Sequence, residues 1–331
     1  MKIGLTYDLR AEYLEQGYCE EATAEFDSLE TIDAIDAALR SLGHATDRIG
    51  NVNSLIRRLA LGARWDLVFN IAEGMHGYGR EAQVPALLDA FEIPYTFSDP
   101  LVLALALHKG TAKRLVRSIG VPTPDFAIVR GDSDLDAIDI PWPVFAKPIA
   151  GGSSSGISAA SKAQNKKELA RACRDVLDRF QQPVLVETFL PGREFTVGLV
   201  GTGKKSRVLG VMEILLSERA ERSVYSYCNK KNYLSNVSYR LADNDEAQAM
   251  SEMALQIWNN LGCRDAGRVD IRCDGDGKPN FLEVNPLAGL HPVDSDIVIL
   301  CRLLGISHLD LIGTIVQSAQ ERVPVNPTTA N

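Results

Sequence analysis

Several features that would place this chain of 331 residues in other protein classes are missing. No apolar run approaches the ~20 residues that cross a bilayer as a helix, so we expect no membrane span. No long block of Lys and Arg occurs, and the formal net charge is −8, which argues against a general nucleic-acid-binding surface. The start, MKIGLTYDLR, enters a predicted strand without a signal-peptide pattern, which favours a cytoplasmic protein.

Known short motifs for several activities are also absent. The six cysteines form no C-x-x-C pair, and we interpret them as reduced cytosolic thiols rather than as disulfides or zinc ligands. No G-x-G-x-x-G follows the first predicted strand, and no G-x-S-x-G elbow is present. The segment GLVGTGKKS resembles a P-loop, but Lys205 stands where that motif needs Ser or Thr. We therefore interpret GTGKK as a hairpin turn.

What is present has the composition of an ordinary globular protein, with 45% hydrophobic and 24% charged residues. Strand-like and helix-like segments alternate over residues 1–105, which predicts an N-terminal α/β domain with a parallel sheet. Residues 106–190 predict a small central α+β unit. Antiparallel strands with helices dominate residues 191–331, although the polar stretch 217–240 has no clear period and is predicted to be a mobile loop.

A predicted hairpin near the C-terminal end collects charged side chains. The segments GRVDIRC and NFLEVN flank the turn sequence DGDGKP, a typical strand–turn–strand pattern. Because side chains alternate across a strand, Arg268, Asp270 and Arg272 are predicted to share one face of the first strand, and Phe281, Glu283 and Asn285 one face of the second.

The register of this hairpin decides whether its carboxylates meet. If Cys273 pairs with Asn280, then Asp270 lies opposite Glu283, and the preceding arginine lies opposite Asn285. Facing carboxylates repel, and a hard cation removes that penalty. Two carboxylates and an amide oxygen suit Mg²⁺, with phosphates as further ligands. A solvated polar face is the alternative interpretation.

The stretch KPIAGGSSSGIS, residues 147–158, allows two interpretations. Its composition is that of a flexible linker, whereas a Gly-rich turn between strands can form an anion cradle. Lys147 follows the apolar run VFA, and Lys109 opens a predicted basic helix. Either ammonium could pair with phosphate oxygens, although a lone lysine is usually solvated. The position between strand-like runs favours a phosphate loop.

Five segments occur in a fixed order: HKGTAKRL, VFAKPIAGGSSSGIS, VETFLPGREFTV, GRVDI and FLEVNPLAGLHP. In this order, and with these gaps, the chain resembles the ATP-grasp superfamily and within it the D-alanine–D-alanine ligases, over nearly its whole length. The resemblance implies a three-domain ATP-grasp fold, with ATP held between two sheets. The three domains would correspond to residues 1–105, 106–190 and 191–331.

The resemblance also implies roles for individual residues. Lys109 and Lys147 would contact nucleotide phosphates. Further nucleotide contacts would come from Gly151, Gly152, Glu187, Thr188, Phe189, Leu190, Glu194 and Lys231. Two Mg²⁺ ions, or Mn²⁺ in their place, would be bound by Asp270, Glu283 and Asn285. The acyl-transfer chemistry would involve Arg268, Ser153, Ser154, Tyr233 and the backbone of Gly289.

The departures from the family lie in the segments expected to hold the substrates. The Gly-Gly loop and the following Glu of the family are missing, so Glu25 or Asp27 would bind a substrate ammonium instead. Where the family grips the carboxylate of its second substrate, this chain has Asp294 followed by Ser295, and Asp294 would repel a carboxylate. Two further candidate substrate residues, in a segment that matches the family, are His76 and Glu81.

The resemblance predicts an ADP-forming carboxylate–amine ligase that acts through an acyl phosphate on amino-acid-like substrates. Two molecules of D-alanine are a first guess, and a different amino acid or a secondary-metabolite carboxylate is the alternative. An ATP-dependent phosphotransferase and a nucleotide-binding protein without catalysis also stay open. The resemblance suggests a homodimer, and we expect neither a nucleic-acid nor a membrane partner.

Overall fold

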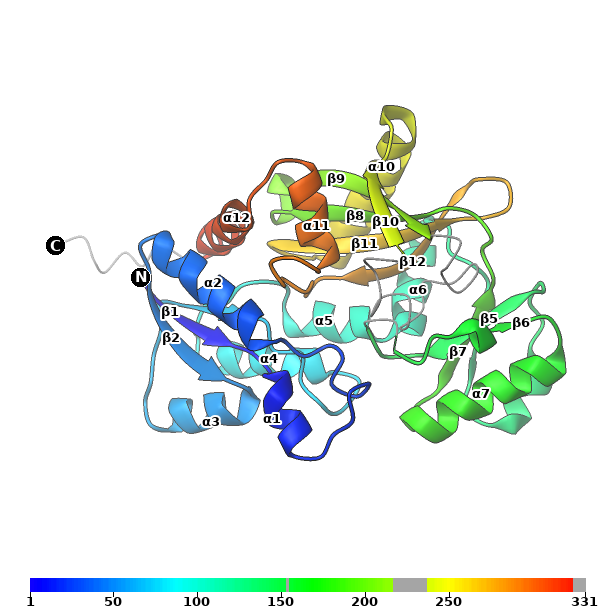
Figure 1. Cartoon of the computed structure of the whole chain (residues 1–331), viewed down its shortest axis with the longest axis horizontal. Helices are drawn as coiled ribbons and strands as arrows, with labels where there is room; N and C mark the ends of the chain where they lie inside the picture. The colour runs from blue at the N-terminus through cyan, green and yellow to red at the C-terminus, as the bar shows by residue number, and fades with distance from the viewer. Residues whose placement is uncertain (153–154, 217–236, 324–331) are drawn as a thin grey trace.

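Three β-sheets organise the chain in the computed structural model, which describes residues 1–152, 155–216 and 237–323 (Figure 1). The first sheet is parallel and contains the early strands, and the other two are antiparallel. This confirms the predicted combination of an N-terminal parallel α/β unit with two antiparallel units that also carry helices.

The N-terminal sheet has the order β2-β1-β3, formed by Lys2–Thr6 (β1), Ala45–Gly50 (β2) and Leu67–Asn70 (β3). Its helices are α1 (Arg10–Glu15), α2 (Leu29–Ser41), α3 (Val52–Ala60), α4 (Gln83–Ala90) and α5 (Pro100–Leu107). Helix α2 begins where the Ser28 side chain accepts a hydrogen bond from the backbone of Thr31, and the chain turns at Gly43 with a φ of 84°.

The central sheet has the order β4-β7-β5-β6, formed by Phe126–Val129 (β4), Val184–Thr188 (β7), Val144–Pro148 (β5) and Lys162–Ala163 (β6). Helix α6 (Lys109–Ser118) leads into this unit, and α7 (Lys166–Phe180) covers the sheet with its apolar face. The strand after the glycine loop starts at Lys162 and is preceded by a 3₁₀ turn at Ala159–Ser161.

The C-terminal sheet has the order β10-β9-β8-β11-β12, formed by Glu194–Val200 (β8), Arg207–Leu216 (β9), Val237–Leu241 (β10), Ala266–Cys273 (β11) and Pro279–Asn285 (β12). Its helices are α10 (Asn244–Leu261), α11 (Asp296–Leu303) and α12 (His308–Gln320). The GTGKK segment turns between β8 and β9, as predicted. The stretch 237–240, predicted as loop, belongs to β10, and the rest of that loop prediction lies outside the described residues.

The β11–β12 hairpin contains an irregularity that the alternating pattern did not predict. Asp270 pairs with Glu283 as expected, but Ile271 pairs with Phe281, so Leu282 is an extra residue on β12. Beyond this bulge the predicted register is wrong by one residue. The bulge turns Phe281 into the core while Glu283 lines a cleft, so the prediction that both share a face is also wrong.

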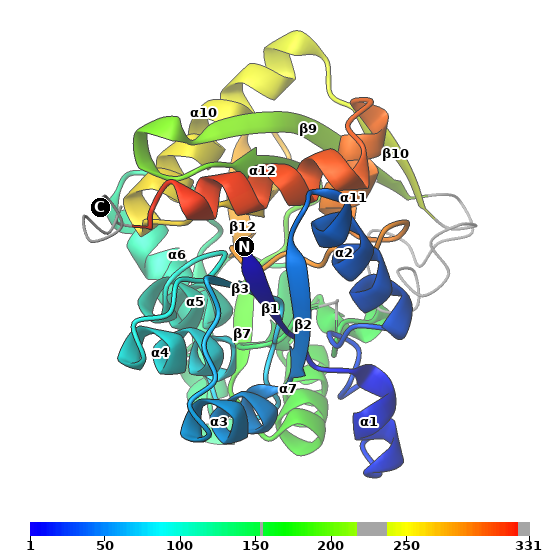
Figure 2. The ribbon, with the colours of Figure 1, turned by 90° about the vertical axis from the view of Figure 1, so that its left-hand side faces the viewer.

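The first and third sheets share one hydrophobic core. Apolar residues of β1 and α2 pack with those of α11 and α12, and Figure 2 shows α12 crossing over the N-terminal sheet. Cys173, Cys263, Cys273 and Cys301 are buried free thiols, and Cys19 is exposed. Within the described part of the chain, no single helix is long and apolar enough for a membrane span; the bent pair α11–α12 passes such a test by length and composition.

Candidate active site

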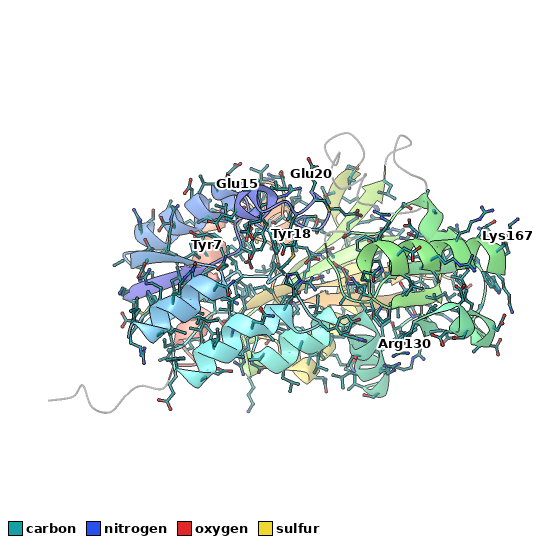
Figure 3. The ribbon with its side chains drawn as sticks, turned by 90° about the horizontal axis from the view of Figure 1, so that it is seen from below. Tyr7, Glu15, Tyr18, Glu20, Arg130 and Lys167 are labelled. Carbon is teal, nitrogen blue, oxygen red and sulfur yellow. The ribbon has the colours of Figure 1, made fainter. Side chains whose placement is uncertain are left out.

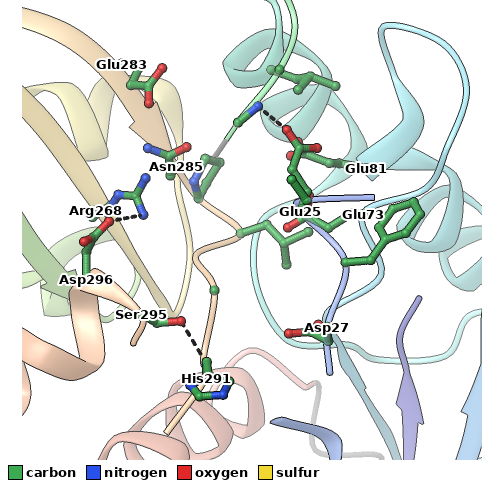
Figure 4. Close-up of a pocket in the computed structure, with 18 of the residues that line it drawn as sticks. Glu25, Asp27, Glu73, Glu81, Arg268, Glu283, Asn285, His291, Ser295 and Asp296 are labelled. Atoms are coloured by element: carbon green, nitrogen blue, oxygen red, sulfur yellow. Dashed lines mark hydrogen bonds and ion pairs between the residues drawn. The ribbon is translucent and has the colours of Figure 1, made fainter. Parts of the chain in front are cut away.

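A cleft of about 450 Å³ opens where the three units meet (Figure 4). Loops that follow the parallel neighbours β1 and β3 emerge at one edge of the first sheet and form one wall, a usual place for ligands in such sheets. The start of α6 and the glycine loop after β5 form the base. The β11–β12 hairpin and the segment before α11 form the opposite wall.

The hairpin brings the predicted metal-binding side chains together. Asn285 donates its amide nitrogen to Asp270 Oδ2 over 3.0 Å, and Thr196 donates to the other oxygen of Asp270 over 2.8 Å. Gly267 permits this approach of the strands, since a Cβ there would lie 2.5 Å from the carbonyl oxygen of Asn285. Burial, opposed by Arg268, raises the pKa of Asp270 to about 6.

Arg268 lies between two carboxylates. Its Nε is 3.2 Å from Asp270 Oδ2, and its Nη1 is 3.2 Å from Asp296 Oδ2. Burial lowers the pKa of the guanidinium, but these two carboxylates outweigh burial and hold the pKa above its ordinary value. Asp296, the first residue of α11, was not among the predicted site residues, because a charge at a helix start is commonly explained by the helix dipole.

Lys109 connects the base of the cleft to the hairpin. Its Nζ is 3.1 Å from Glu283 Oε2 and also donates to the carbonyl of Gly151. Burial raises the pKa of Glu283, but Lys109, Lys147 and Arg268 outweigh burial and lower it to about 2. Glu283 is therefore an ionised carboxylate among cations.

Beneath the cleft, Glu187 bridges two lysines. Lys147 Nζ lies 2.6 Å from one carboxylate oxygen, and Lys113 Nζ lies 2.9 Å from the other. Burial raises the pKa of Glu187, but both ammonium groups outweigh burial and lower it, whereas burial lowers the pKa of Lys113 to about 8. Lys113 was missed by sequence reasoning, although its place one helical turn after Lys109 could have indicated it.

A second cavity, of about 110 Å³, lies between the central sheet and β11. Many of the predicted nucleotide contacts line it, namely Lys147, Glu187, Thr188, Phe189, Leu190 and Glu194. The Glu194 carboxylate accepts a hydrogen bond of 2.9 Å from Nη1 of Arg272. Arg268, Asp270 and Glu283 line this cavity too, so it adjoins the hairpin charges.

The N-terminal wall is rich in carboxylates. Glu25 Oε2 is 2.5 Å from Arg80, and its other oxygen accepts from the backbone nitrogen of Gly152. Burial, opposed by Arg80 and reinforced by Glu25, raises the pKa of Glu81 to about 7. Burial and nearby carboxylates also raise the pKa of Glu73 well above its ordinary value, and Glu73 was not among the predicted site residues.

The segment before α11 closes the far end of the cleft. Ser295 accepts a hydrogen bond of 2.8 Å from the backbone of His291, and His291 Nδ1 is 3.7 Å from Asp294. Gly289, Asp294, Ser295 and the predicted substrate residue Asp27 all line the cleft. His76 lines neither cavity; it is exposed, with its Nε2 3.4 Å from the Tyr18 hydroxyl.

Comparisons with known proteins agree with this arrangement. A family model described as "D-ala D-ala ligase C-terminus" matches residues 115–317. A D-alanine–D-alanine ligase of Aquifex aeolicus is 34% identical over 268 residues, which cover 80% of this chain and 86% of that protein. This chain belongs to the D-alanine–D-alanine ligase family. The predicted class, an ATP-dependent carbon–nitrogen ligase that forms an amide bond, is confirmed.

Solved structures of ligases of this family have the same fold. A D-alanine–D-alanine ligase from Bacillus anthracis, complexed with ATP, superposes with a TM-score of 0.73 at 20% identity, covering 97% of this chain and 98% of that one. The VanG D-Ala:D-Ser ligase from Enterococcus faecalis superposes with a TM-score of 0.73 at 21% identity. The match covers 96% of this chain and 99% of that one. The predicted three-domain ATP-grasp fold is therefore confirmed.

Not every relative in this family has a named activity. An uncharacterized protein of Sinorhizobium fredii, y4sG, is 32% identical over 303 residues, covering 88% of this chain and 87% of that protein. Four residues that the family resemblance singled out, Ser153, Ser154, Lys231 and Tyr233, lie outside the described residues. Their assignments stay predictions.

Proposed function

We propose that this ligase uses ATP and Mg²⁺ to convert an amino-acid-like carboxylate into an acyl phosphate, and then transfers the acyl group to an amine. The observation that carries this proposal is the meeting of three features at one cleft. These are the Asp270–Glu283 pair of the hairpin, Arg268 beside it, and Lys109 at the base next to Gly151.

The donor set of the hairpin fits Mg²⁺. Asp270 and Glu283 offer carboxylate oxygens, and Asn285 offers an amide oxygen at the end of the side chain opposite the nitrogen that bonds Asp270. The raised pKa of Asp270 also fits, because a cation beside a buried carboxylate restores its ionised form. When bound, Mg²⁺ would neutralise phosphate charge during phosphoryl transfer.

The other side chains position charge around the reacting groups. Lys109 and Lys147, bonded to Glu283 and Glu187 in this structure, would turn to nucleotide phosphates. The substrate carboxylate oxygen attacks the γ-phosphorus, and ADP leaves. The amine then attacks the acyl carbon, phosphate leaves, and the amine nitrogen loses a proton. Arg268 would stabilise the negative oxygens of both steps, and the backbone of Gly289 would assist at the acyl carbon.

Two substrates with free amino and carboxyl groups agree with the names of the relatives, which include D-alanine–D-alanine ligases and a D-Ala:D-Ser ligase. For this chain, the pair D-alanine plus D-alanine is one candidate among amino-acid pairs. The acidic Asp294 at the far end of the cleft supports a pair that differs from the one joined by those relatives.

The experiment is an incubation with ATP, Mg²⁺ and a matrix of D- and L-amino-acid pairs, with ADP release and product mass as readouts. We expect ADP release that needs both substrates, together with a product one water lighter than their sum. A stable phosphorylated product formed from one substrate would instead identify a phosphotransferase. No ADP release with any pair, despite ATP binding, would contradict the proposal.

A further inference from the structure

The N-terminal wall of the cleft carries a group of carboxyl side chains for which the described residues supply no ion-pair partner. We define this acidic wall as Asp27, Glu73 and Glu81, which follow β1 and β3 and line the same cleft. None of the three forms an ion pair with a described residue. Glu81 is only 9% exposed and, within the described chain, takes no hydrogen bond, yet it lines the cleft (Figure 4). A buried, ionised carboxylate without a partner is costly, so a cationic ligand in the cleft would stabilise the ionised form of Glu81.

The described cations near the wall form their ion pairs and hydrogen bonds with other residues, although the charge of Arg80 also opposes the rise in the pKa of Glu81. Arg80 is bonded to Glu25 at 2.5 Å, and Arg10 donates to Thr23 and to the carbonyl of Glu20. The remaining cationic side chains of the lining belong to the hairpin side, where Lys109 contacts Glu283 and Arg268 contacts two aspartates. Among the described residues, no cation therefore lies within ion-pair distance of the three wall carboxylates, which line the cleft.

An organic cation fits this wall better than a metal ion. Within the described part of the chain, no group of three His, Cys, Asp or Glu side chains is placed to hold a metal. Burial, and after it the repulsion from Glu81, Glu25 and Asp27, raises the pKa of Glu73, so a nearby ammonium group would restore its ionised form. A single α-ammonium group balances only one carboxylate.

We propose that the substrate held against the acidic wall is a basic, diamino compound such as lysine, ornithine or a shorter homologue, with a cationic nitrogen in addition to its α-amino group. The inference rests on the proposed function, because it assigns the substrate class of the same cleft. The second nitrogen bonds the wall and takes no part in the amide-forming steps, so the reaction remains as written above.

The test compares charged amino acids with their neutral isosteres. Binding of lysine and norleucine, and of ornithine and norvaline, in both enantiomers, is measured by calorimetry on the full chain with Mg²⁺ and a non-hydrolysable ATP analogue. We expect one basic amino acid to bind about tenfold or more tightly than its isostere, the scale of a charge-assisted hydrogen bond. Equal affinities within every pair would overturn the inference.

Substitutions in the acidic wall test whether the preference for a basic amino acid arises there. The double variant Glu73→Gln/Glu81→Gln should reduce the preference for the basic amino acid by about tenfold or more. Glu15→Gln, on the exposed surface of α1 in Figure 3, removes the same charge outside the cleft and should keep the preference. A preference that survives in the double variant would overturn the assignment to this wall. If that variant does not fold, Asp27→Asn replaces it, with the same expected loss.

The two proposals fail in different ways. ADP release with neutral amino-acid pairs, at a kcat/KM equal to or above that of basic pairs, would overturn the inference and leave the ligase function standing. Tight binding of a basic amino acid without any ADP release would support the acidic wall and contradict the ligase function.

Discussion

On the hairpin side of the cleft, Arg268 lies between Asp270 and Asp296, and Lys109 contacts Glu283. On the N-terminal side, Glu73 and Glu81 have no ion pair with any described residue. The hairpin side is thus organised before a ligand arrives, as catalysis by preorganised charges requires. The N-terminal side has carboxyl groups that pair with no described cation, and groups of this kind can distinguish substrates by their charge.

The largest effect should come from the hairpin carboxylate that faces Asp270. We expect Glu283→Gln to lower kcat about a thousandfold, the scale of losing a group that stabilises transition-state charge. The measurement is steady-state ADP release, with thermal unfolding to verify that the fold is intact. Near-normal turnover in this variant would contradict the metal-site assignment, and Glu15→Gln serves as the control with full activity.

The buried lysine beneath the hairpin should matter mainly for stability. Lys113→Met leaves Glu187 with Lys147 alone, and removing one partner of a buried ion pair costs about 3 kcal/mol. Chemical denaturation gives the free energy of unfolding. The control is Lys167→Met, because Lys167 is exposed on α7 (Figure 3) and should change the stability by less than about 0.5 kcal/mol. Equal effects of both variants would disprove the buried bridge.

The acidic wall should show itself in the pH dependence of stability. The pKa of Glu81 is raised to about 7 in the folded protein, whereas an unfolded glutamate titrates near 4.3. The folded state therefore binds more protons between these values, and stability is lost as the pH rises through about 7.

Glu81→Gln removes this titration, so we expect it to be more stable than the wild type by about 2 kcal/mol at pH 8, and to lose that advantage by pH 5. Thermal unfolding across this range measures the difference. A constant difference between the two proteins would show that the wall is already neutralised in the free protein.

A smaller effect is expected from the second carboxylate at Arg268. Asp296→Asn keeps the shape of the side chain but removes the charge that holds Nη1 of Arg268. We therefore expect kcat to fall about tenfold while the KM for ATP stays unchanged. Asp296→Glu should recover part of the loss. If kcat is unaffected in the asparagine variant, Asp270 alone orients the arginine.

Sequence reasoning succeeded where local patterns decide the structure. Alternation placed Arg268, Asp270 and Arg272 on one face of β11. The order of the five motifs led to the ligase family. Reasoning failed at the bulge of Leu282, because an extra residue in one strand is favoured by packing of Phe281 against distant residues rather than by local preference.

The sequence by itself determined the fold family, the type of reaction and the position of the charged β11–β12 hairpin, because these depend on strand alternation and motif order along the chain. Only the tertiary structure decided which charges pair. Lys113, Asp296 and Glu73 were missed, since each acquires its role from a residue far away in the chain or from burial in the cleft. The strength of an ion pair depends on the distance between the charges and on the exclusion of water, and the local sequence predicts neither.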